Sequence, residues 1–306
     1  MLKCMIGIAV FPAASTLGAP GPTTPIVTIL TGKATVIHAL SQFDAAEGVR
    51  LSADDLVRTG KDTFLRIEYE DQSSIELGPQ TQLQLNYPAV RKKSNRPGLY
   101  VLEGWVKVGA GKPDGADKAA FAAIGMEVTD MTGVMVLRAG GAAGELFAEQ
   151  GSAHWVDRDH RAEPVTLKQG DFLIAAPGRA PRLEPRPSAD FTAALPRLYR
   201  DTLPFRYNLF RDHVVVPENA GAFTYADVES WINAEPSIRR QFVSTWRRKA
   251  DDPAFRAALD RDLQKHPEWD PVLHPEKFEP PTPPRAATAS PTAASQPDPA
   301  LPHPNH

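Results

Sequence analysis

The strongest constraint on the fold is an alternation of apolar and polar side chains in residues 64–86. In residues 65–70, LRIEYE, every second residue is apolar and the others are charged, which is the period of a strand with one buried and one solvated face. The alternation breaks at Asp-Gln-Ser, residues 71–73, and at Gly-Pro, residues 78–79, which are turn-forming sequences. The stretch therefore predicts an antiparallel meander of three strands.

The same strand and turn rhythm extends over residues 26–178, and we expect one β domain there. Residues 179–222 are richer in proline and predict a linker or strap. Residues 223–278 predict a small three-helix bundle, because Thr224 can cap a first helix and Pro236 and Pro253 suit the first turns of two more. Residues 279–306 hold mostly Pro, Ala, Ser and Thr, a composition typical of a disordered tail.

Residues 1–19 resemble a secretory signal peptide: Lys3 precedes a short apolar run, and small residues follow it. The run is shorter than the ~20 residues that a membrane-spanning helix needs. An ordinary disordered start is the alternative. The single cysteine is Cys4, so we expect no disulfide and no cysteine-based zinc site. The mature protein is expected in the periplasm.

Several motifs resemble the FecR domain of bacterial envelope signalling proteins. Residues 55–60, DLVRTG, match its "GDxxRTG" element, although Asp54 stands where the family has glycine. Further matches lie at residues 71–73, 75–81 and 102–106, with weaker ones near Gly151 and Gly170. The motif residues are Asp55, Arg58, Thr59, Gly60, Asp71, Ser73, Gly78, Thr81, Gly104, Gly151 and Gly170. The resemblance covers residues 26–178 and implies a mainly β fold, sandwich- or solenoid-like.

These motif residues are of the types that form and stabilise turns, so we expect them to have a structural role. Gly60, Gly78 and Gly104 are the residue type that a turn with positive φ requires, and hydroxyl side chains beside them can bond turn amides. An arginine can form a salt bridge with a neighbouring carboxylate, and we expect Arg58 to pair with Asp55. The motifs thus predict a scaffold, with the binding surface elsewhere.

The resemblance implies a non-enzymatic protein that binds a protein partner in envelope signalling, such as the periplasmic part of a membrane sensor or transporter. Members that regulate iron uptake also carry a cytoplasmic sigma-factor-binding segment and a membrane span, neither of which is evident in this chain. The alternative is an envelope glycan- or peptidoglycan-binding protein, suggested by Tyr87, Tyr100 and Trp269 as solvent-facing aromatic residues.

We expect neither catalysis nor a cofactor, because no Ser, His and Asp arrangement stands in a nucleophile context. The densest group of candidate metal ligands is His154, Asp157 and His160, for which a polar hairpin is the competing interpretation. A net charge of −3, from 34 basic and 37 acidic side chains, gives no field that would attract nucleic acid.

Overall fold

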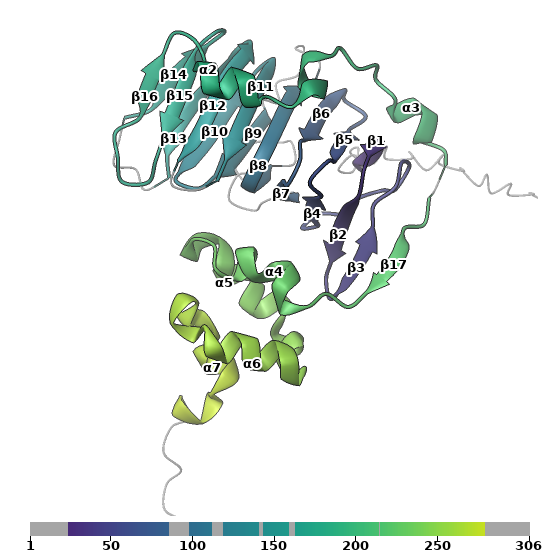
Figure 1. The fold of residues 1–306 in the computed structure, drawn as a ribbon, viewed down its shortest axis with the longest axis vertical. Helices are drawn as coiled ribbons and strands as arrows, with labels where there is room; N and C mark the ends of the chain where they lie inside the picture. The colour runs from purple at the N-terminus through teal and green to yellow at the C-terminus, as the bar shows by residue number, and fades with distance from the viewer. Residues whose placement is uncertain are drawn as a thin grey trace, which may run out of the picture.

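The computed structural model describes residues 24–85, 98–111, 119–140, 143–158, 163–213 and 215–278. The predicted signal peptide and the predicted C-terminal tail lie outside these residues. Two β-sheets form the upper part of the molecule, and helices pack below one of them (Figure 1). The prediction of a mainly β chain with C-terminal helices is confirmed.

The first sheet, called sheet 1, is antiparallel throughout. Its strands, in spatial order, are β1 (Ile26–Thr31), β5 (Phe64–Glu68), β6 (Ser73–Leu77), β8 (Leu99–Ala110), β11 (Val134–Ala139), β12 (Gly144–Gln150), β15 (Phe172–Ala175) and β16 (Arg182–Glu184).

The second sheet, called sheet 2, contains one parallel pair, β8 with β9. Its strands, in spatial order, are β17 (Glu218–Gly221), β3 (Ser41–Asp44), β2 (Ala34–His38), β4 (Leu56–Thr59), β7 (Gln82–Leu85), β8, β9 (Ala119–Ala123), β10 (Met126–Met131), β13 (Ser152–Asp157) and β14 (Val165–Lys168).

Strand β8 belongs to both sheets. Residues 99–103 pair with β7 in sheet 2, and residues 106–110 pair with β6 in sheet 1. Between them Gly104 has φ +96°, in the region that favours glycine. Successive pairs of strands then alternate between the sheets: β9 and β10 lie in sheet 2, β11 and β12 in sheet 1. The sheets pack face to face as in a sandwich, while the chain advances along them as in a solenoid.

The predicted meander is wrong in one respect. Strands β5 and β6 do form a hairpin, with Leu65 opposite Leu77 and Ile67 opposite Ile75. Strand β7, however, pairs with β4 and β8 in sheet 2 and not with β6. The alternation of apolar and polar residues fixes which side chains point inward, but it is the same for a strand in either sheet. It therefore could not show that the chain passes from sheet 1 to sheet 2 between β6 and β7.

A strap covers the outer face of sheet 1. It runs from β16 to β17 and contains α2 (Ala189–Ala194), the 3-10 turn η1 (Arg197–Arg200) and α3 (Tyr207–Phe210). Phe191 and Tyr199 are buried against Phe64, Val136 and Phe172 of the sheet. The Tyr199 hydroxyl also donates to the carbonyl oxygen of Glu76, at 2.8 Å. Aromatic burial and a satisfied hydroxyl together fix the strap in place.

The strap corrects a second expectation, that the polar face of β5 is solvated. Arg66 and Glu68 are 9% and 0% exposed. They form an ion pair with each other at 2.8 Å, and the strap residue Arg206 donates its backbone N–H to Glu68 at 2.7 Å. Polar side chains on a strand can be buried where partners satisfy them, which the sequence of β5 alone does not disclose.

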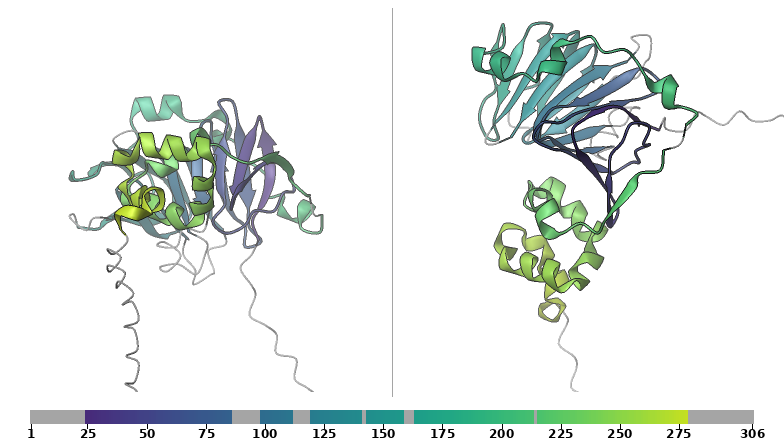
Figure 2. Two further views of the ribbon diagram at one scale, coloured as in Figure 1. Left: turned by 90° about the horizontal axis from the view of Figure 1, so that it is seen from below. Right: turned by 45° about the vertical axis from the view of Figure 1, so that its right-hand side comes forward.

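Residues 223–278, called the helical unit, pack on the outer face of sheet 2 (Figure 2). Its helices are α4 (Tyr225–Ile232), α5 (Pro236–Thr245), α6 (Pro253–Arg261) and α7 (Asp270–Leu273), with the 3-10 turns η2 (Arg247–Asp251), η3 (Leu263–Lys265), η4 (Pro267–Trp269) and η5 (Pro275–Lys277). The three predicted helix starts are confirmed. Trp231, Trp246 and Trp269 are at most 2% exposed and form the core of the unit with Ile37, Leu56 and Tyr100 of the sheet.

Candidate functional site

The threonines of the FecR-like motifs form a buried hydrogen-bond network where the chain crosses between the sheets. Thr59 Oγ1 donates to the carbonyl oxygen of Gly78 at 2.7 Å and accepts from the backbone N–H of Thr81 at 2.8 Å. Thr81 Oγ1 accepts from the backbone N–H of Trp105 at 3.0 Å. These hydroxyls satisfy backbone groups where the sheet ladders are interrupted, which is a structural role.

The motif glycines differ in what they require. Gly104 has positive φ, and a Cβ there would lie 2.4 Å from Thr81 Oγ1. Gly151 and Gly170 also have positive φ, in the turns that follow β12 and β14. Gly60 and Gly78 do not, which corrects the expectation for them. At Gly78 a Cβ would instead approach the Trp105 Cβ to 2.9 Å, so close packing is the requirement.

The Asp-Gln-Ser motif forms the turn between β5 and β6, as predicted. Asp71 Oδ1 accepts from the backbone N–H of Ser73 at 2.9 Å and from its hydroxyl at 2.5 Å. Gln72 adopts φ +70°. A short carboxylate side chain that bonds the backbone two residues on is typical of such turns.

The expected pair between Arg58 and Asp55 does not form. Arg58 Nη2 lies 3.2 Å from Asp227 Oδ1 in α4, so the arginine of the β-domain motif contacts the helical unit. Asp55 accepts from the backbone N–H of Ser52 at 2.7 Å, and its other oxygen lies 2.6 Å from His38 Nδ1. The sequence does not reveal the partner of Arg58, because Asp227 lies 169 residues away along the chain.

The candidate metal ligands are not brought together in the part that the structure describes. His160 lies outside it. His154 and Asp157 both belong to β13 and not to a hairpin turn, and their three-residue spacing places them on opposite faces of the strand. His154 Nδ1 lies 3.2 Å from Asp130 Oδ2 at the surface. Among the described residues, no three potential ligands of these types gather into a group that could hold a metal ion.

The aromatic residues expected to bind glycans are also not available as a platform. Tyr100 and Trp269 are each 1% exposed. The Tyr100 hydroxyl donates to Glu235 Oε1 at 3.1 Å, and Trp269 lies inside the helical unit. Tyr87 falls outside the described residues. A sugar-stacking role needs an exposed ring face, so the expectation of solvent exposure is wrong for Tyr100 and Trp269.

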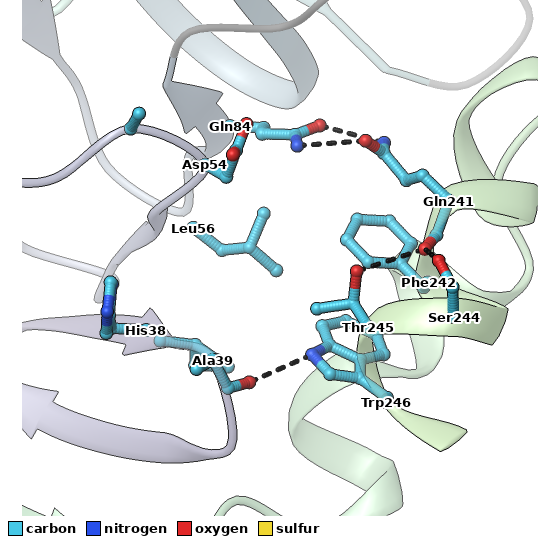
Figure 3. A pocket seen from close by; sticks show the side chains of 12 residues that line it. His38, Ala39, Asp54, Leu56, Gln84, Gln241, Phe242, Ser244, Thr245 and Trp246 are labelled. Carbon is cyan, nitrogen blue, oxygen red and sulfur yellow. Dashed lines mark hydrogen bonds between the residues drawn. The ribbon is translucent and has the colours of Figure 1, made fainter. Parts of the chain in front are cut away.

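A pocket of about 360 Å³ lies between sheet 2 and α5 (Figure 3). Its apolar surfaces come from Ile37 and Leu56 of the sheet and from Phe242 and Trp246 of the helix, all at most 7% exposed. The sheet side and the helix side each contribute polar side chains. These are His38, Asp54 and Gln84 on the sheet side, and Gln241, Ser244 and Thr245 on the helix side.

Hydrogen bonds across the pocket hold its two walls together. The side-chain amides of Gln84 and Gln241 exchange two hydrogen bonds, at 2.9 and 3.1 Å. Trp246 Nε1 donates to the carbonyl oxygen of Ala39 at 3.1 Å (Figure 3). One neutral amide pair and an indole N–H therefore position α5 on the sheet, which makes the pocket a preformed feature of the fold.

Beside the pocket, Asp55 is a buried carboxyl in contact with the pocket residue His38. Burial raises the pKa of Asp55, although the Ser52 amide and the His38 ring act against this shift. The hydroxyls of Ser244 and Thr245 both donate to the carbonyl oxygen of Gln241, and they lie on the wall opposite His38 (Figure 3). A hydroxyl nucleophile needs a base within hydrogen-bonding reach, and His38, on the opposite wall, does not stand in that relation to either hydroxyl.

Sequence reasoning did not find this pocket. Phe242 and Trp246 are four residues apart in the helix predicted to start at Pro236, a spacing that places them on one face. The spacing does not identify the strand residues that this face contacts. His38, Gln84 and Gln241 belong to no motif. One sequence feature did point to such a contact. The helical segment is rich in large aromatic residues, which indicates that its helices pack on another element.

Comparisons with known proteins show only a weak similarity, and only to solved structures. No protein-family model matches the chain, and no curated protein matches it. Two crystal structures described as "a putative anti-sigma factor" from Parabacteroides distasonis are similar to it at 12% identity, with TM-scores of 0.37 and 0.36. Each comparison covers 46% of this chain, which spans 63% and 64% of those proteins, less than two thirds. In the described residues no helix has the length and apolarity to cross a bilayer.

Proposed function

We propose that the chain is a non-enzymatic, FecR-like regulatory protein of the periplasm that binds a protein partner, the periplasmic part of a membrane sensor or transporter. The motifs at residues 55–60, 75–81 and 102–106 support the resemblance, since their residues form hydrogen bonds where the chain crosses between the two sheets. The observation that carries the binding function is the pocket of Figure 3, with its apolar floor and hydrogen-bonding rim.

The pocket suits an apolar side chain presented by another protein. Binding hot spots are concentrated where one partner inserts an anchor side chain into a preformed apolar pocket surrounded by polar groups that exclude water. Leu56 and Phe242 would form the walls against such an anchor. The exposed residues Ser244 and Thr245 stand at the rim, where a partner backbone would pass. The peptidoglycan alternative has no comparable support, because Tyr100 and Trp269 are buried.

A blocking substitution at the rim tests the proposal. Ala53 is exposed and lines the pocket, so Ala53→Arg places a long charged side chain at its mouth without entering the core. Ala193→Arg in α2 is the matched control, because α2 lies on the outer face of sheet 1, on the other side of the molecule (Figure 1).

The partner would be captured from envelope extracts with the wild-type protein, identified, and its periplasmic region purified for calorimetry. Loss of an anchored hot spot costs about 2 kcal/mol or more, so Ala53→Arg should weaken binding at least about thirtyfold. Ala193→Arg should bind like the wild type. Equal affinity of Ala53→Arg and wild type, or failure to recover any membrane protein, would contradict the proposal.

A further inference from the structure

The helical unit contains a buried lysine whose charge is only partly compensated. Lys249, in η2, is 8% exposed. Its Nζ donates to the carbonyl oxygen of Phe223 at 2.6 Å. The ammonium also lies 4.5 Å from the ring centroid of Phe223 and 5.4 Å from that of Phe255. Attraction to aromatic faces offsets part of the cost of removing a cation from water.

Lys249 has further hydrogen-bonding capacity that no other described residue takes up. An ammonium carries three N–H donors, and one of them is accounted for by Phe223. Within the described part of the chain no Asp or Glu forms an ion pair with Lys249. Buried charges in proteins are normally paired, because an isolated buried ion is costly. An anion beside Lys249 would complete this arrangement.

A pocket of about 340 Å³ lies at this lysine. Most of its uncharged wall residues are small or aromatic, and they include Ala222, Phe223, Ala226, Ala254, Phe255 and Ala258. The volume is within the range of small-molecule sites, roughly 300–1,000 Å³. Alanines leave space beside the two phenylalanine rings, so the walls fit a compact apolar body.

The charges at the pocket favour an anion. Lys249 and Arg261 both line it, and the only carboxylate in the lining is Asp252. Asp252 accepts from the backbone N–H groups of Ala254 and Phe255, at 2.8 and 3.3 Å, and so caps α6. Its charge is therefore engaged with the helix terminus. Arg261 is mostly exposed and lies 3.5 Å from Asp262, which leaves the buried Lys249 ammonium to determine the preference of the pocket.

We infer that this pocket binds a small organic monoanion: a carboxylate that pairs with the Lys249 ammonium, attached to an apolar body that lies between the alanines and the Phe223 and Phe255 rings. A carboxylate fits better than a phosphate, because one buried ammonium matches one negative charge and the walls offer apolar contact on the other sides. This site is separate from the partner pocket of Figure 3, and the inference does not depend on the proposed function.

Calorimetry on the full chain tests the inference with two matched pairs of probes, benzoate against benzamide and hexanoate against hexanamide. Each pair shares its apolar body and differs in charge. We expect saturable binding of at least one carboxylate and binding of its neutral amide that is weaker by at least about tenfold, the contribution of one charge-assisted hydrogen bond.

Two variants and a control locate the site. Lys249→Met keeps the length of the side chain and removes the charge, and it should lose carboxylate binding by at least about tenfold. Ala226→Phe fills the pocket from an exposed position in α4 and should do the same even if Lys249→Met fails to fold. Lys277→Met removes an exposed lysine of the same unit, paired with Asp270, and should change nothing.

Absence of saturable binding by both carboxylates overturns the inference. So does binding that Ala226→Phe leaves unchanged, or that a folded Lys249→Met leaves unchanged. Inorganic phosphate is the remaining probe: if it displaces the bound carboxylate at equal concentration, the site recognises charge alone, and the inference of an apolar organic ligand is wrong.

Discussion

The guanidinium of Arg58 in β4 lies 3.2 Å from the carboxylate of Asp227 in α4. The same carboxylate accepts from the backbone N–H of Thr224 at 2.8 Å and from its hydroxyl at 2.7 Å. One acidic side chain thus caps the first helix of the helical unit and ties it to the β domain. The arginine of the FecR-like motif therefore contributes to how the two parts of the molecule are joined.

Removal of this contact should loosen the helical unit. The pair is partly exposed, so Arg58→Met should lower the free energy of unfolding by about 0.5–1 kcal/mol. Asp227→Asn also weakens the cap and should cost about 1–2 kcal/mol. Denaturant unfolding measures both, and hydrogen exchange should locate the loss in α4. Arg182→Met, which breaks a pair within β16, should cost less than about 0.5 kcal/mol. Equal effects of Arg58→Met and Arg182→Met would contradict the role given to Arg58.

Acid should weaken the same joint. Burial acts to raise the pKa of Asp227, but the bonds from Thr224 and Arg58 lower it more, and the pKa falls below its ordinary value of 3.8. A lowered folded-state pKa contributes stability that is present above the unfolded value and lost as pH falls through the folded value. The difference in stability between wild type and Asp227→Asn should therefore shrink below about pH 4. A difference that stays constant down to pH 2 would exclude this linkage.

Asp55 should show the opposite dependence. Burial raises its pKa above 3.8 despite the Ser52 amide and the His38 ring. A raised folded-state pKa means that stability is lost as pH rises from 3.8 through the folded value. Stability of the wild type relative to Asp55→Asn should decline over that window and be level above it. Because the His38 hydrogen bond lowers this pKa, His38→Gln should move the window to higher pH. NMR titration of the Asp55 carboxyl checks the direction, and a pKa at or below 3.8 would contradict it.

Gly104→Ala separates steric overlap from backbone strain. Gly104 has φ +96° and Gly221 has φ +94°, but a Cβ at Gly104 would lie 2.4 Å from Thr81 Oγ1, whereas a Cβ at Gly221 has nothing within 4 Å. Gly221→Ala should cost about 1 kcal/mol for the unfavourable φ. Gly104→Ala should cost about 3 kcal/mol or more, since Thr81 or the strand must also move. If denaturant unfolding gave the same loss of stability for both variants, the steric overlap with Thr81 would be relieved without cost, which would contradict the prediction.

Local patterns predicted the elements of this fold, and the missing information was long-range. Thr224, Pro236 and Pro253 predicted three helix starts from capping and proline chemistry alone. The crossing from β6 to β7 could not be predicted, because inward and outward positions alternate identically in either sheet. The partner of Arg58 could not be predicted either. An arginine pairs with any carboxylate that the fold brings near, and the sequence alone suggested its neighbour Asp55.

The proposed function places a protein partner at the pocket between sheet 2 and α5. A photo-crosslinking amino acid at Ser244, an exposed residue at the pocket rim, tests it most directly, with the same substitution at Thr192 in α2 on the opposite outer face as the control. We expect irradiation of envelope preparations to link position 244, and not position 192, to one membrane protein, and we expect Ala53→Arg to abolish the crosslink. A crosslink from both positions, from position 192 alone, from neither, or one that persists with Ala53→Arg, would contradict it.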